Sequence, residues 1–132
     1  MRAFTEAIQM QLCYGNVPYT YYMAWEYFEK SWPEMKKEIG FGQLPVLIVD
    51  NQTTIWQSGS IMRYTAKLAN TLPANEEDRA IADAIFESSQ ELFQPLNATI
   101  NFKTGEEYEA LKKTILSSFE PKIFYFNKYL ER

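Results

Sequence analysis

Gln57 and Ser58 stand where a short apolar run gives way to a segment with helical periodicity. A hydroxyl, a side-chain amide and the free N–H groups of a helix N-terminus together suit a carboxylate, because the helix dipole concentrates positive charge there. Pro45 opens the apolar run, and its missing N–H leaves the neighbouring backbone free to pair with another group. The Leu44-Pro45 bond is also a place where a cis peptide is expected. A ligand with an extended peptide backbone and a carboxylate would satisfy both features. The alternative interpretation is that these residues form only an ordinary strand that starts with a proline and an ordinary capped helix, with no binding role.

A strand, a turn, a second strand and a helix must position these residues. The β-branched run Val46–Val49 ends at Asp50-Asn51, which predicts a strand and a turn, and Thr53–Trp56 predicts the strand that completes a hairpin. Ser58 is expected to be the N-cap of the helix that follows. The spacing that predicts this helix is formed by Ile61, Met62, Thr65, Ala66 and Ala69.

The composition limits the chemistry, the partners and the compartment. The 132 residues include no histidine, which excludes a Ser/His or Cys/His nucleophilic pair and a His-ligated metal, so we expect no metal cofactor. The net charge of −4 argues against nucleic acid or an anionic membrane as a partner. No apolar run approaches the roughly 18 residues of a membrane span. A single cysteine cannot form an internal disulfide, so we expect the cytoplasm or another reducing intracellular compartment.

The segment before the hairpin predicts a helix and a further strand. Ile8 and Leu12 stand four residues apart, and the pattern stops at Gly15, which predicts a helix with a glycine C-cap. Residues 17–23 predict a strand, because apolar and aromatic side chains alternate there at period two. The alternating residues are Tyr19, Tyr21 and Met23.

Cys13 lies near the C-terminal end of the predicted first helix, beside its apolar face. A thiol nucleophile is activated at the positive N-terminal end of a helix, and position 13 is at the opposite end. We therefore expect a buried structural thiol here and not a catalytic one.

Two further helices are predicted after a linker at residues 71–75. The first begins at Glu76 with an acidic turn that suits the positive end of a helix, and Pro95 should kink or end it. Thr104 and Glu107 have the spacing of a capping box that opens the second. A single pair of helices cannot bury both apolar faces, so another chain or further residues should cover them. The faces consist of Ile81, Ala84, Ile85, Ser88, Leu92 and Leu96, and of Leu111, Ile115, Phe119, Ile123 and Phe126.

The hairpin region resembles the glutathione-binding half of cytosolic glutathione transferases, nearest to the sigma-like classes and the related pi class. The residues that carry the resemblance are Gly42-Gln43-Leu44-Pro45 and Gln57-Ser58-x-x-Ile61-x-Arg63-Tyr64. The resemblance implies an α/β thioredoxin-like domain at residues 1–70, incomplete because the first strand of the family is absent. An all-α helical hairpin at residues 76–132 would correspond to the first helices of the family's C-terminal domain. The family's catalytic tyrosine would fall before Met1, so no catalytic residue is assigned.

The resemblance also implies a set of glutathione-binding residues. Gln57 and Ser58 would hold the γ-glutamyl carboxylate, and the backbone of Leu44 would hold the cysteinyl unit. Trp32 and Lys36 would hold the glycine carboxylate, through an indole N–H and an ammonium group. The alternative for this pair is a packing tryptophan and an exposed lysine. The other implied positions are Arg2, Gln43, Pro45 and Glu87.

Phe41 lies between two glycines, with nothing local expected beside it. A large aromatic side chain in such a loop is either exposed without a role or an anchor for a partner. In several classes of the family, an aromatic residue here inserts between the two helices that open the second domain of the other subunit. Ile81 and Ile85 would belong to that socket. The resemblance thus favours a homodimer, or a subunit of a larger protein assembly, while the alternative is that Phe41 folds back onto its own domain.

Three classes of function remain open at this point. The chain could be an enzyme that joins glutathione to an electrophile, a glutathione-binding module without catalysis, or a structural subunit that keeps the transferase fold for its interface. The implied binding residues favour glutathione as substrate or ligand. The missing tyrosine argues against conjugation by this chain alone.

Overall fold

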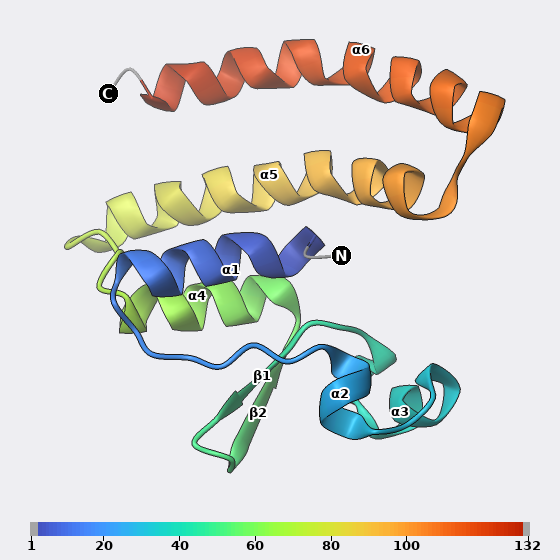
Figure 1. Ribbon diagram of the computed structural model, residues 1–132. Coiled ribbons are helices and arrows are strands. Elements are labelled where there is room, and N and C mark those ends of the chain that lie inside the picture. The colour runs from blue at the N-terminus through green and yellow to red at the C-terminus, as the bar shows by residue number, and fades with distance from the viewer. Residues whose placement is uncertain (1–2, 131–132) are drawn as a thin grey trace. The chain divides into compact units, whose positions relative to one another are not determined.

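The computed structural model describes residues 3–130, which form two compact units with a boundary between Leu72 and Pro73. The first unit combines helices with a small sheet, and the second is a pair of long helices (Figure 1). The elements in chain order are α1 (Ala3–Tyr14), α2 (Ala24–Phe28), α3 (Trp32–Glu38), the 3-10 turn η1 (Gly40–Gly42), β1 (Val46–Val49), β2 (Thr53–Trp56), α4 (Ser58–Leu68), α5 (Glu76–Phe102) and α6 (Gly105–Leu130).

The predicted hairpin is confirmed. Strands β1 and β2 pair antiparallel, with Val46 opposite Trp56 and Val49 opposite Thr53. The turn between them places Asp50 and Asn51 at φ 50° and 55°, as hairpin turns that match the twist of the strands require. The Leu44-Pro45 peptide directly before β1 is cis, also as expected.

The core of the first unit lies between α1 and α4, which run side by side (Figure 1). Ile8 and Leu12 of α1 are buried together with Ile61 of α4, whose side chain is 1% exposed. Val17, Leu47, Ile55 and Met62 pack around this cluster. At Gly15 an added Cβ would lie 2.4 Å from the Cα of Ala69, so α1 ends against α4 at a point that has no room for a side chain. The hairpin and the start of α4 are therefore attached to a packed helical pair.

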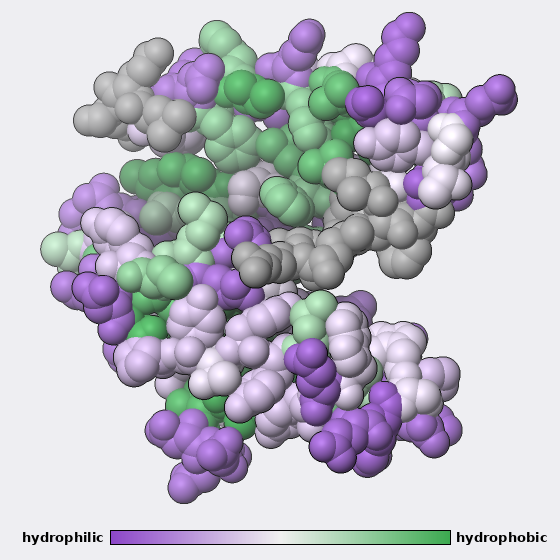
Figure 2. All heavy atoms as spheres, in the orientation of Figure 1, coloured by the Kyte–Doolittle hydropathy of each residue, from purple (hydrophilic) through white to green (hydrophobic). Residues whose placement is uncertain are grey.

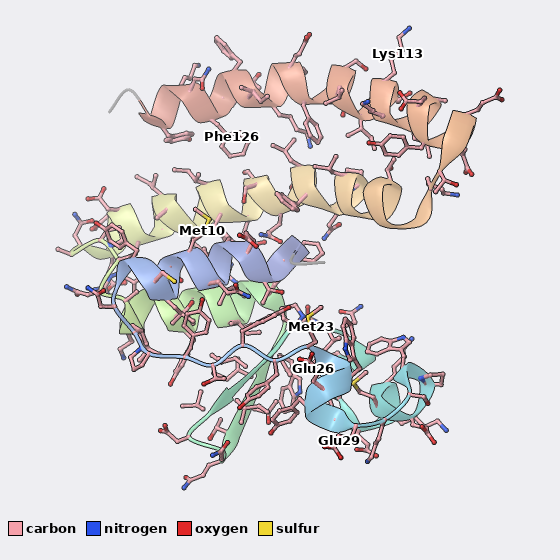
Figure 3. The ribbon with its side chains drawn as sticks, viewed as in Figure 1. Met10, Met23, Glu26, Glu29, Lys113 and Phe126 are labelled. Atoms are coloured by element: carbon pink, nitrogen blue, oxygen red, sulfur yellow. The ribbon has the colours of Figure 1, made fainter. Side chains whose placement is uncertain are left out.

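The predicted strand at residues 17–23 is not formed. This segment has no regular structure, and α2 begins after it at Ala24. The N–H of Met23 donates to the carboxylate of Glu26, both labelled in Figure 3. Within the segment, the hydroxyl of Tyr21 donates to Sδ of Met23 two residues later. Alternating side chains become a strand only when a neighbouring backbone supplies hydrogen bonds, and within the described residues the sheet has only β1 and β2.

Cys13 is exposed, which corrects the expectation of a buried thiol. Its Sγ lies 3.5 Å from the hydroxyl of Tyr19. The buried positions of α1 are Ile8 and Leu12. Cys13 follows Leu12 directly, so the 100° rotation per residue of a helix turns it away from that face.

The second unit is the hairpin of α5 and α6. Asn75 caps α5 by accepting a hydrogen bond from the N–H of Asp78. Pro95, expected to kink or end α5, lies inside the helix, which continues to Phe102, so it does not end the helix. Glu107, expected in a capping box, accepts a hydrogen bond from Nζ of Lys103.

Apolar side chains gather over α5 and α6 (Figure 2), and Phe126 points from α6 toward α5 whereas Lys113 points away from it (Figure 3). Both stripes remain partly exposed, at Ile81 on α5 and at Ile123 on α6 for example, as expected for a single helical pair. Neither of these helices, nor any other in the described part of the chain, has the length and apolarity needed to cross a membrane.

Candidate functional site

The N-terminus of α4 is formed differently from the sequence prediction. Gln57, not Ser58, occupies the N-cap position, with φ 68° and ψ 122°, and its carbonyl accepts the first helical hydrogen bond from the N–H of Ile61. Ser58 is the first residue with helical geometry. The prediction was wrong by one residue. Ser58 was expected to be the cap because a serine side chain caps a helix better than a glutamine side chain does, but the backbone turns into the helix directly after β2, at Gln57. The residue with the unusual backbone is thus a glutamine, and the hydroxyl follows it inside the first turn.

The loop before β1 reaches this helix end. Nε2 of Gln57 donates a hydrogen bond of 3.3 Å to Oε1 of Gln43. The pairing of Val46 with Trp56 holds the two backbones together immediately beyond this contact. Gln43, the exposed Leu44 and the half-buried Pro45 therefore lie beside the N-terminus of α4, on a surface open to solvent. The structure brings these predicted site residues together.

Lys36 of helix α3 packs against the same loop. An added Cβ at Gly42, where φ is +58°, would lie 3.1 Å from Cγ and Cε of Lys36, so the aliphatic stem of the lysine lies against the backbone next to Gln43. Trp32 is 43% exposed and stands four residues earlier, on the same face of α3. An exposed ammonium and an exposed indole N–H can both donate to an anion.

Glu34, which lies between Trp32 and Lys36 in sequence, has a structural role. Its carboxylate accepts hydrogen bonds from Oγ of Ser31 at 2.6 Å and from the N–H of Ser31 at 3.2 Å, and so closes the capping box of α3. The hydroxyl of Ser31 is the main cause that holds the pKa of Glu34 below its ordinary value, followed by the Ser31 N–H, with a contribution from the charge of Lys30. The carboxylate thus stabilises the start of the helix that carries Lys36.

Phe41 is 75% exposed and has φ +61°. The expectation that nothing local lies beside it is wrong, because its ring meets the ring of Trp56 edge to face, with 6.3 Å between the centroids. The sequence placed Trp56 at the end of a predicted strand but did not indicate its contact with this loop. The available signal was a large aromatic residue directly before Gln57, at the end of a strand.

The remaining predicted positions are not among the described residues of the first unit. Arg2 is outside the described residues. Glu87 and Ile81 are exposed on α5, in the second unit, and Ile85 is half-buried on the same helix. No group of three or more cysteines or carboxylates in the described part of the chain is placed to hold a metal ion.

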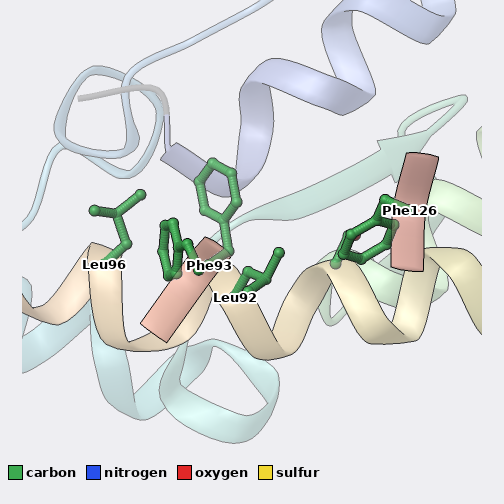
Figure 4. A pocket seen from close by; sticks show the side chains of 6 residues that line it. Leu92, Phe93, Leu96 and Phe126 are labelled. Carbon is green, nitrogen blue, oxygen red and sulfur yellow. The ribbon is translucent and has the colours of Figure 1, made fainter. Parts of the chain in front are cut away.

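The second unit contains two open cavities between its helices. One has a volume of about 290 Å³ and is almost wholly apolar (Figure 4); its lining residues are Ser89, Leu92, Phe93, Leu96, Phe119 and Phe126. The other, of about 280 Å³, is more polar, because Nζ of Lys122 lies 3.7 Å from the carboxylate of Glu91 at its edge. Both are gaps between the two apolar stripes.

Comparison with known proteins identifies the family. The family model described as "Glutathione S-transferase, N-terminal domain" matches residues 1–67. The chain is 28% identical over 115 residues to Glutathione S-transferase P 10 of Caenorhabditis elegans, across 87% of this chain and 54% of that protein. It is 29% identical over 123 residues to Glutathione S-transferase 4 of the same organism, across 91% and 56%. A solved structure of prostaglandin synthase D of Nilaparvata lugens superposes with a TM-score of 0.73 at 28% identity, across 97% of this chain and 61% of that one.

A hairpin with a cis-proline entry, a packed helical pair and a following helical hairpin define a thioredoxin-like α/β unit joined to an all-α unit. The chain belongs to the glutathione S-transferase family. The family and the fold class expected from the sequence are thus confirmed. The chain spans little more than half the length of the two Caenorhabditis elegans relatives that it matches.

Proposed function

We propose that this chain binds glutathione through a domain formed by residues 1–70. The observation that carries the proposal is the contact between Gln57, at the N-terminus of α4, and Gln43, beside the Leu44–cis-Pro45 entry to the hairpin. The backbone of Gln57 supports it, because a non-glycine residue at φ 68° and ψ 122° is strained, and strained residues concentrate at ligand sites. Membership of the family implies glutathione as substrate or ligand.

Each part of the tripeptide has a chemical counterpart on this surface. The Ser58 hydroxyl and the N–H groups of the first turn of α4 would donate to the γ-glutamyl carboxylate, together with the Gln57 amide. The backbone of Leu44 would pair with the cysteinyl unit, as an extended peptide pairs with a strand. Lys36 and Trp32 would donate to the glycine carboxylate. Pro45 and Gln43 shape the site, and Arg2 and Glu87 belong to the proposal through the family resemblance alone.

Isothermal titration calorimetry with glutathione tests this site. Ser58→Ala should weaken binding by about 1.5–3 kcal/mol, because the hydroxyl donates to a charged group. The matched control is Ser117→Ala, which removes an exposed hydroxyl that donates to the carbonyl of Thr114 in α6. This control should bind as the unmutated chain does. If the unmutated chain does not bind glutathione, or if Ser58→Ala binds equally well, the proposal is wrong.

We further propose that residues 1–132 alone do not conjugate glutathione to electrophiles. Conjugation needs a donor beside the thiol that stabilises the thiolate. Tyr14 is exposed at the C-terminal end of α1, and Ser60 lies within α4, so neither is a counterpart of the family's tyrosine at the start of its domain. An assay with a chlorinated aromatic acceptor should give no rate above the uncatalysed reaction. A rate comparable to that of ordinary transferases would show that another residue activates the thiol.

Assembly is the last part of the proposal. An exposed Phe41 supports an anchor for a second subunit, with Ile81 and Ile85 as parts of its socket, in a homodimer or in a larger assembly. We place the protein in the cytoplasm and, through the resemblance of the hairpin region, nearest to the sigma-like classes. The alternative function is a non-catalytic structural subunit. It predicts a stable assembly that binds no glutathione.

A further inference from the structure

The indole ring of Trp56 lies against the backbone of Gly40. A Cβ built on Gly40 would be 2.5 Å from Cε2, 2.7 Å from Nε1 and 2.8 Å from Cδ2 of the indole, so the ring occupies the space that any side chain at position 40 would need. The neighbouring Phe41 meets the same ring edge to face. Trp56 is nevertheless 37% exposed, which is more than a core residue shows. Its indole packs against Gly40 and Phe41 of the loop.

Four contacts join the loop of residues 40–46 to residues 56 and 57, one of them the edge-to-face contact of Phe41 with Trp56. The backbone of Trp56 pairs with Val46 at one end of the loop, and its indole covers Gly40 at the other end. Between them, Gln57 donates to Gln43. At the start of the loop, the N–H of Gly42 donates to the carbonyl of Ile39 at 2.9 Å, and this hydrogen bond closes the single 3-10 turn η1. The indole therefore packs against the start of the loop, at Gly40, while the stem of Lys36 packs against Gly42, next to Gln43.

We infer that Trp56 is a positioning residue for the glutathione site: its indole holds the loop of residues 40–44 in the conformation that presents Gln43 and the Leu44 backbone to the ligand. The inference rests on the proposed function, since the ligand is the one proposed above. Trp56 itself touches the loop and needs no contact with glutathione. Without the indole, the loop regains freedom that binding must then remove.

A double-mutant cycle tests this inference directly. Trp56→Ala should weaken glutathione binding roughly tenfold, which corresponds to restoring the freedom of about one backbone residue. Gly40→Ala should weaken binding to a similar extent, because the new methyl group displaces the indole. Gly40 does not have a positive φ, so its backbone accepts alanine without strain. In the Trp56→Ala background, Gly40→Ala should have no further effect, since the obstructing ring is gone.

Two further variants separate positioning from general destabilisation. Trp56→Phe retains a ring over Gly40 and should recover most of the affinity that Trp56→Ala loses. Trp25→Ala removes a tryptophan that is 61% exposed in the same unit, and it should bind glutathione as the unmutated chain does. If Trp56→Ala does not fold, Gly40→Ala and Trp56→Phe still test the inference on their own.

Hydrogen exchange without ligand supplies a readout that is independent of glutathione. Amides of residues 40–44 should exchange faster in Trp56→Ala and in Gly40→Ala, while amides in α1 and α4 keep their protection. If the unmutated chain does not bind glutathione, the proposed function fails, and the exchange data still judge the role of the indole. Equal amide exchange at residues 40–44 in all variants would overturn the inference. It would also be overturned if Gly40→Ala weakened glutathione binding as much in the Trp56→Ala background as in the unmutated chain.

Discussion

Replacing Gln57 with glycine should stabilise the fold and weaken glutathione binding. Gln57 has φ 68° and ψ 122°, and holding a residue with a Cβ in such a region costs on the order of 1–3 kcal/mol. Glycine avoids this cost but loses about 0.5–1 kcal/mol through the greater freedom of its unfolded chain. The hydrogen bond to Gln43 is long and exposed, so its loss costs about 0.5 kcal/mol. The three terms together give between about −0.5 and +2 kcal/mol, so the central expectation is a gain of about 0.75 kcal/mol in the free energy of unfolding.

Urea unfolding of Gln57→Gly and Gln57→Ala measures this effect. Alanine removes the same amide but keeps the Cβ, so the difference between the two variants isolates the backbone. We expect the glycine variant to be more stable than the alanine variant by about 1 kcal/mol. Both variants should bind glutathione more weakly, and to a similar extent. An alanine variant as stable as the glycine variant would refute the assignment of strain to this residue.

Three other predictions concern the core, a carboxylate and the assembly. Ile61→Ala should destabilise the chain by about 2–5 kcal/mol in urea unfolding, whereas Ile123→Ala, at a position that is 47% exposed, should cost clearly less. Ser31→Ala should raise the pKa of Glu34 toward its ordinary value in an NMR titration. Because the folded-state pKa is lowered, this contact stabilises the fold above the unfolded-state pKa, and its contribution is lost as pH falls through the folded value. Phe41→Ala should weaken dimerisation by roughly 2–4 kcal/mol in sedimentation, and an unaffected dimer would place the interface elsewhere.

Features set by neighbouring residues could be predicted from the sequence. The hairpin follows from the β-branched run and from Asp50-Asn51, and α4 follows from the spacing of its apolar residues. The cis peptide at Pro45 follows from an X-Pro bond at a strand entry. Each of these depends on a few residues that are adjacent in the chain.

Features that depend on distant residues could not be predicted in the same way. Residues 17–23 alternate like a strand, yet a strand needs a partner backbone that the pattern does not supply. Helix α5 continues through Pro95 because the packing of a long apolar face outweighs one missing hydrogen bond. The contact of Trp56 with Gly40 joins residues sixteen positions apart, and neither has a motif of its own.

An NMR titration of the ¹⁵N-labelled chain with glutathione is the decisive measurement for the proposed binding site, because it locates the ligand residue by residue. We expect the largest shifts at the backbone amides of Leu44, Gln57 and Ser58 and at the side-chain amide of Gln43. Smaller shifts are expected at Lys36 and at the indole N–H of Trp32. Shifts confined to α5 and α6, or a spectrum unchanged at millimolar glutathione, would contradict the proposed site.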